Sequence, residues 1–251
     1  MRAIRNGPVT GLTAQVLLLA ALAGTVGLND AGWVVGLTCG VVTNALLARG
    51  LARHHTDRLG PADRVTLARV TLAGGVAALT ADSFGRPAPV RTLLALTAVA
   101  LVLDAVDGWV ARRTATESAL GAIFDGEADA FLMLVLSVYV ARSAGAWVLA
   151  IGTARYAFLV AGWLLPWMSR TLPPRYWRKV VAGTAGVALT LAVPDVLPRL
   201  LTNTLLAVSL ALLAESFGRD VWWLWRRRHV GPSRVMVPAE LGPSAGEAHD
   251  G

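Results

Sequence analysis

The stretch that decides the fold, residues 103–131, reads LDAVDGWVARRTATESALGAIFDGEADAF. Two apolar segments within it carry acids at helical spacing, Asp104 and Asp107 in the first and Asp125 and Asp129 in the second. Residues three or four apart lie on one face of a helix. A short polar turn joins the two segments, so we expect the helices to pack as an antiparallel pair. Four carboxylates would then converge near one end of this helical hairpin.

The composition of the whole chain is that of a membrane protein. Hydrophobic residues make up 55% and charged residues only 16% of the chain, and the mean hydropathy is +0.57. Soluble domains carry about 25% charged residues, and a helix needs about 20 apolar residues to cross a bilayer. The stretches that approach this length are 12–28, 32–48, 65–81, 91–107, 121–141, 146–166, 180–196 and 200–225. We therefore predict an all-α integral membrane protein with about eight transmembrane helices.

The basic residues are concentrated in alternate loops. The net charge is +7 and the pI is near 10.9, a balance that also occurs in nucleic-acid-binding proteins. If both termini lie inside, most of the 23 Lys and Arg residues fall in the inner segments, which are 1–11, 49–64, 105–120, 167–179 and 219–251. This is the positive-inside bias of membrane proteins. It predicts a multi-pass protein of the cell (inner) membrane with cytoplasmic inner loops, and it argues against a nucleic-acid partner.

Three parts of the chain are distinguished by composition. Residues 1–50 are expected to form an accessory N-terminal transmembrane hairpin, and residues 61–226 a six-helix catalytic domain. A basic linker with a Gly60-Pro61 breaker separates them. Residues 231–251 are rich in Pro, Gly, Ser and Glu and are predicted to be a disordered cytoplasmic tail. For the first span, an uncleaved helix is favoured over a cleaved signal peptide.

Four convergent carboxylates within a membrane protein call for a cation. Like charges at close range repel or take up protons, and a charged side chain in the bilayer is costly. Carboxylate oxygens suit hard cations, which indicates Mg²⁺ or Mn²⁺. Mg²⁺ usually binds carboxylates together with substrate phosphates, so a diphosphate ligand is expected. Any one of these aspartates could be a helix cap, whereas all four on matching helix faces favour a metal site.

The same residues resemble the signature of the CDP-alcohol phosphatidyltransferases, D-x-x-D-G-x-x-A-R-x₈-G-x-x-x-D-x-x-x-D. All its fixed positions are present, at Asp104, Asp107, Gly108, Ala111, Arg112, Gly121, Asp125 and Asp129. The resemblance implies a six-helix membrane core, a homodimer, and a cytoplasm-facing site for a CDP-linked donor and two divalent metal ions.

Roles for individual residues follow from this resemblance. It implies that Asp104, Asp107 and Asp125 are metal ligands, and that Asp129 is a further ligand and the general base. The residues that would line the CDP site are Gly108, Ala111, Arg112 and Gly121. Glycine lacks a Cβ, so Gly108 and Gly121 would let a nucleotide approach the helix backbone.

A weaker likeness to the same family precedes this motif. Residues 61–69 look like the family's P-x-x-hydrophobic-T-x-x-R opening of the first core helix. Thr66 and Arg69 would then lie near the CDP phosphates. The alternative is that they serve as a helix-capping residue and an interfacial snorkelling arginine.

The acceptor site is less clearly marked in the sequence. Arg155 lies within the predicted span 146–166, where it either binds an acceptor phosphate or neutralises the carboxylate cluster. Arg178 and Lys179 resemble the basic stretch that opens the fifth core helix in members using phosphorylated alcohols, or are positive-inside loop residues. Ala130 follows the fourth aspartate, where members of the phosphatidylglycerophosphate type typically have lysine.

The absence of that lysine weakens glycerol 3-phosphate as the acceptor, and no signature of the inositol-phosphate branch is found, so the acceptor stays open. Two acids of the last span, Glu215 and Asp220, are candidate partners for the inner-loop arginines. Downstream, three tryptophans and three arginines between residues 222 and 228 indicate an interfacial anchor.

These observations predict a metal-dependent transfer of a phosphatidyl group from CDP-diacylglycerol to an alcohol or phosphorylated alcohol, with release of CMP, in phospholipid biosynthesis. The reverse arrangement, a CDP-alcohol reacting with diacylglycerol or another lipid alcohol, uses the same motif. A cation transporter is the alternative from another class, because intramembrane aspartates also line ion pathways. Acids for transport are expected near the membrane midplane, whereas Asp104, Asp107 and Asp125 lie toward helix ends beside a basic inner loop.

Overall fold

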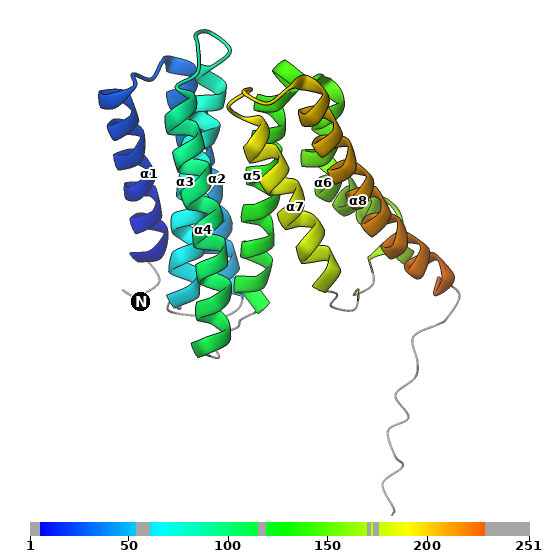
Figure 1. The fold of residues 1–251 in the computed structure, drawn as a ribbon. Helices are drawn as coiled ribbons and strands as arrows, with labels where there is room; N and C mark the ends of the chain where they lie inside the picture. The colour runs from blue at the N-terminus through cyan, green and yellow to red at the C-terminus, as the bar shows by residue number, and fades with distance from the viewer. Residues whose placement is uncertain (1–5, 54–60, 115–118, 170–171, 173–175, 229–251) are drawn as a thin grey trace, which may run out of the picture.

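The computed structural model describes residues 6–53, 61–114, 119–169, 172 and 176–228, and within them all regular secondary structure is helical. The predicted tail at 231–251 lies outside these residues. The α-helices are α1 (Asn6–Thr25), α2 (Asp30–Arg53), α3 (Pro61–Asp82), α4 (Val90–Thr114), α5 (Ala119–Ala144), α6 (Leu149–Leu164), α7 (Tyr176–Ala192) and α8 (Arg199–Arg226). Each predicted apolar stretch lies on one of them (Figure 1). The prediction of an all-α membrane protein is confirmed.

The outer surface of the bundle is strongly apolar. Four helical segments of the described residues are long and apolar enough to cross a membrane: Asp30–Arg49, Asp63–Asp82, Ala146–Leu164 and Arg199–Arg226. Large hydrophobic side chains on the outside are exposed, for example Trp163 at 86% and Leu200 at 81%. Such surface is unfavourable in water and favourable against lipid tails. Helix α5 is less apolar in its first half because it carries the acids of the candidate site.

Helix α3 is the central element of the first five helices. It packs against α1, α2, α4 and α5, and Figure 1 shows it with α2 and α4 in the group of helices between α1 and α5. Most of its buried core residues are small or β-branched, including Ala73, Val76 and Ala78, and Leu67 and Leu79 are the buried leucines. The N-terminal hairpin meets it through glycine: the buried Gln15 of α1 lies against Gly40 of α2 and Gly74 of α3. The hairpin therefore packs on the same helix that supplies part of the site.

A group of polar contacts around Asp82, Arg86 and Ser83, which we call the polar clasp, joins the α1–α2 and α3–α4 loops at the end of the bundle where α3 ends. Asp82, fully buried at the end of α3, accepts a hydrogen bond from the backbone N–H of Asn29 (2.8 Å) and forms an ion pair with Arg86. Arg86 also donates to the carbonyl of Gly27, and Arg142 of α5 donates to the hydroxyl of Ser83. The buried charge of Asp82 is thus compensated, and the loops between α1 and α2 and between α3 and α4 are fixed to each other.

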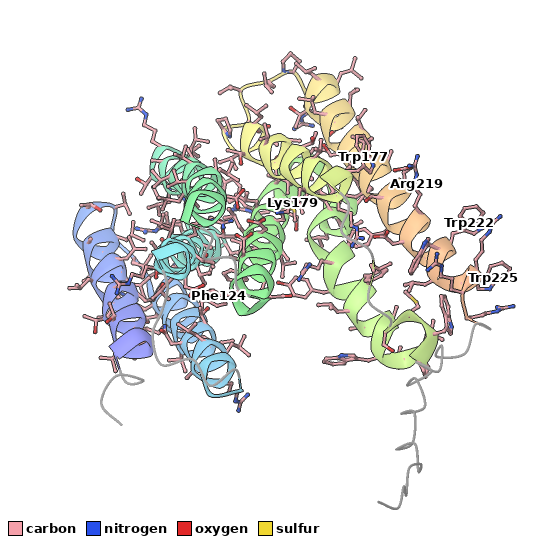
Figure 2. All side chains as sticks on the ribbon, turned by 90° about the horizontal axis from the view of Figure 1, so that it is seen from below. Phe124, Trp177, Lys179, Arg219, Trp222 and Trp225 are labelled. Carbon is pink, nitrogen blue, oxygen red and sulfur yellow. The ribbon has the colours of Figure 1, made fainter. Side chains whose placement is uncertain are left out.

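The end of α8 carries the predicted aromatic and basic anchor. Arg226 lies over the ring of Trp222 (3.7 Å), Arg227 over that of Trp223 (4.1 Å) and Arg228 over that of Trp225 (4.4 Å). Figure 2 shows Trp222 and Trp225 projecting from this end of α8. Tryptophan and arginine in this arrangement are typical of a membrane interface.

Helices α5 and α6 approach each other most closely at Gly152. A Cβ built there would lie 2.6 Å from the Cα of Leu134. We expect Gly152→Ala to separate these helices and to lower the free energy of unfolding in detergent by about 1–3 kcal/mol, as overpacking does in tight cores. Gly183→Ala in α7 is the matched control, because a Cβ there has no atom within 4 Å. It is expected to leave stability unchanged or to raise it slightly, since alanine favours helix. Equal effects of the two substitutions would contradict close α5–α6 packing at Gly152.

Candidate metal centre and its surroundings

The acidic residues of α4 and α5 meet beside α3. Asp104 lies in the second half of α4, and Asp125 and Asp129 lie one turn apart in the first half of α5. Each offers a carboxylate oxygen, and the three oxygens lie within 4.8 Å of one another. The structure thus brings together three of the four predicted carboxylates. The side chain of Asp107 lies outside the described residues.

Helix α3 forms the third wall of this cluster. It packs extensively against both α4 and α5, whereas α4 and α5 have no extensive contact with each other among the described residues. The expected direct packing of these two helices is therefore replaced by packing of each on α3. The reason lies in charge: two helix faces lined with carboxylates repel, and α3 inserts a positive side chain between them. Like charges on facing helices repel or take up protons, and a cation between them relieves the repulsion.

The positive side chain is Arg69. Nη2 of Arg69 forms an ion pair with Oδ1 of Asp104, and the two atoms are 2.8 Å apart. Its two terminal nitrogens also form ion pairs with Asp125 and Asp129. Arg69 is only 3% exposed, so the alternative of a snorkelling arginine at the interface is wrong. A buried guanidinium needs such carboxylate partners.

The three carboxylates are more accessible than the arginine. The side chains of Asp104, Asp125 and Asp129 are 41%, 35% and 36% exposed. Arg69 therefore lies on the buried side of the cluster, and each of the three carboxylate side chains keeps an accessible part that a ligand can reach. Clustered carboxylate oxygens that face an open site are the ligands that Mg²⁺ and Mn²⁺ prefer, so this donor set fits a divalent cation.

Comparison with known protein families decides the class of the chain. The family model of the CDP-alcohol phosphatidyltransferases matches residues 61–214, which run from the start of α3 into α8. The chain belongs to this family. The resemblance drawn from the aspartate motif is therefore confirmed, and the protein is a member of a transferase family that uses CDP-linked donors and alcohol acceptors in membranes. Searches of curated proteins and of solved structures found no match.

The structure describes the remaining motif positions of this family member only in part. Thr66 is 3% exposed and precedes Arg69 by one helical turn on α3, and Gly121 precedes Asp125 by one turn on α5. Both therefore lie on the helix faces that carry the cluster. The other positions lie within α4, but their side chains are outside the described residues: Gly108, Ala111 and Arg112. Their roles stay predictions.

Arg155 has a partner that the sequence analysis did not single out. Its Nη2 lies 2.6 Å and its Nε 3.2 Å from Oε1 of Glu127 on α5. Glu127 lies between Asp125 and Asp129 in the sequence, and on a helix it faces away from them. Arg155 thus neutralises a carboxylate outside the aspartate cluster. A third acid within an apolar helix is the signal that could have indicated this pair.

The basic residues of α7 lie at its contact with α8. Arg178 forms an ion pair with the buried Asp220 (3.3 Å), which confirms Asp220 as its partner. Glu215 instead forms an ion pair with Arg219 of its own helix and accepts a hydrogen bond from Trp177 (3.2 Å). Figure 2 shows Trp177 and Arg219 where α7 meets α8, with Lys179 further along α7. Lys179 is exposed.

Proposed function

We propose that this phosphatidyltransferase transfers a phosphatidyl group from CDP-diacylglycerol to an alcohol or phosphorylated alcohol and releases CMP. The observation that carries the proposal is the convergence of Asp104, Asp125 and Asp129 within the family-matched region. The family supplies the reaction class, and the open carboxylate cluster supplies a place where a diphosphate and its counter-ions can bind.

In the proposed mechanism, Asp104, Asp107, Asp125 and Asp129 would hold Mg²⁺ or Mn²⁺, and the bound cation would supply the positive charge that a diphosphate donor needs. The acceptor hydroxyl oxygen forms a bond to the β-phosphorus, the bond from that phosphorus to CMP breaks, and the hydroxyl proton passes to the carboxylate of Asp129. The proposed CDP-binding residues are Thr66, Arg69, Gly108, Ala111, Arg112 and Gly121. Positioning and charge stabilisation supply most of the rate in such transfers.

The proposed acceptor-binding residues are Arg155, Arg178 and Lys179. Arg155 lies beside Gly126 of α5, where a Cβ would be 3.3 Å from its Nη2. Both arginines are paired with carboxylates, Glu127 and Asp220. A phosphorylated acceptor that binds one of these arginines would have to break its ion pair with Glu127 or Asp220. An uncharged alcohol would leave both ion pairs intact.

The positive-inside bias supports a cytoplasm-facing site in the cell membrane. The homodimer also remains a proposal. A cation transporter is less well supported, because the acids lie in the family-matched region and within the inner half of α5. Transport sites are expected at broken helices near the membrane midplane, and α5 is continuous from Ala119 to Ala144.

Lipid mass spectrometry tests the donor and identifies the acceptor. Membranes that contain the protein are supplied with CDP-diacylglycerol and a panel of uncharged and phosphorylated alcohols; a second arm receives CDP-alcohols and diacylglycerol. We expect a new phospholipid in the first arm, absent from membranes with the Asp125→Ala variant. Product in the second arm alone would reverse the donor assignment. No product in either arm would refute phosphatidyl transfer.

A further inference from the structure

The position of Arg69 has a consequence for how the cluster binds a cation. The guanidinium of Arg69 forms ion pairs with all three carboxylates of the cluster: with Asp104 at 2.8 Å, and with Asp125 and Asp129. The oxygens concerned are Oδ1 of each aspartate. A divalent cation held by this cluster would draw on the same set of three carboxylates. The side chain and the metal therefore require the same negative charges.

Because of their charge and burial, Arg69 and a divalent cation would compete for these three carboxylates. Two cations held by three carboxylates at hydrogen-bond distance repel each other, and the repulsion is stronger where water is excluded. Arg69 cannot release its positive charge, because a guanidinium stays protonated in proteins. It also cannot turn to water without losing its packing, because it is only 3% exposed.

We propose that Arg69 acts as an internal cation that competes with the divalent metal for Asp104, Asp125 and Asp129. It stabilises the cluster when no metal is bound and thereby weakens the affinity for metal alone. The competition itself does not depend on the proposed function; only its extension to the donor diphosphate, which follows here, rests on that function. A donor diphosphate offers the guanidinium an alternative anionic partner, so donor binding raises metal affinity, and metal raises donor affinity by the same factor.

The exposed fractions of the carboxylates and of Arg69 support this proposal. The carboxylate side chains are 35–41% exposed and Arg69 is 3% exposed, so the accessible side of the cluster is the one that Arg69 does not cover. A metal and a diphosphate can approach from that side, while Arg69 approaches from the protein interior. The negative charge of a bound diphosphate would then offset the excess positive charge of the metal and Arg69, without any movement of Arg69 from its place on α3.

Mn²⁺ binding to the purified full-length protein, measured by titration calorimetry without donor, tests the competition. We expect Arg69→Gln to bind Mn²⁺ about tenfold more tightly than the wild type, within the usual range of coupling between sites. Arg69→Lys retains the charge and is expected to stay closer to the wild type. The matched control is Arg86→Gln, which removes the ion pair with Asp82 in the polar clasp at the other end of the bundle. It is expected to leave Mn²⁺ affinity unchanged.

Thermal unfolding provides a second readout, and it also shows whether each variant is folded before the titration is interpreted. Without metal, Arg69→Gln should unfold at a lower temperature than the wild type, and Mn²⁺ should raise its unfolding temperature by more than it raises that of the wild type. Arg86→Gln is also expected to be less stable, but without this extra gain from Mn²⁺. The difference between the two variants in this Mn²⁺-induced rise distinguishes the loss of an internal cation from a general loss of packing.

The outcomes decide the inference independently of the transfer reaction. Mn²⁺ affinity of Arg69→Gln equal to or weaker than that of the wild type, or no extra stabilisation by Mn²⁺, would overturn the competition. Tighter Mn²⁺ binding in a protein that forms no phospholipid would uphold the inference and refute the proposed function. If Arg69→Gln leaves the Mn²⁺ affinity unchanged and the wild-type protein does form phospholipid, the competition is refuted and the proposed function is supported.

Discussion

Replacing Asp129 with asparagine is expected to reduce turnover by about 10²- to 10⁴-fold, the usual contribution of a general base. Asparagine has nearly the same shape as aspartate but cannot accept the acceptor's hydroxyl proton. Asp104 and Asp125 remain in the variant, and their oxygens lie close to that of Asp129 in the wild type. Binding of Mn²⁺ and of the CDP-linked donor should therefore be retained. Steady-state assays of CMP release, together with calorimetric titration of Mn²⁺ and donor, measure the two effects separately.

Asp195→Asn is the matched control for this variant. Asp195 is an exposed turn residue with a positive φ of 49°, a conformation that asparagine adopts readily. It makes the same chemical change outside the cluster, so turnover should stay at the wild-type level. Undiminished turnover of Asp129→Asn would remove Asp129 as the base. Loss of Mn²⁺ binding in parallel with turnover would make it a metal ligand without a separate role as base.

The helices could be predicted from the sequence because the lipid environment imposes a simple rule. A span must be a continuous apolar helix, since unpaired backbone groups are too costly in the bilayer. The one-turn spacing of Asp125 and Asp129 likewise fixes a common face on any helix. These are local properties of the chain, and both appear in the structure as expected.

The partners of the charged residues could not be predicted in the same way. The pairing of Arg69 with carboxylates on two other helices depends on how α3 rotates between α4 and α5. The pairing of Arg155 with Glu127 depends on the close α5–α6 contact at Gly152. Such contacts join residues far apart in the sequence, and hydrophobic periodicity alone does not specify the rotation of a helix that is apolar on most sides.

Removal of the divalent cation is expected to stop the reaction. The diphosphate of the donor and the three carboxylates of the cluster are all anionic, so without a cation they repel each other and the leaving CMP is not stabilised. Arg69 offers a single positive charge, which three aspartates already use. Chelation by EDTA should therefore reduce turnover to background, and Mg²⁺ or Mn²⁺ added in excess should restore it.

The most direct test of the account is CMP release by the purified protein from CDP-diacylglycerol, measured with and without an acceptor alcohol and with and without Mg²⁺ or Mn²⁺. We expect one CMP for each phospholipid formed, only when both the acceptor and the cation are present. CMP release that persists in EDTA, or its absence with every acceptor and every CDP-linked donor, would contradict metal-dependent phosphatidyl transfer by this protein.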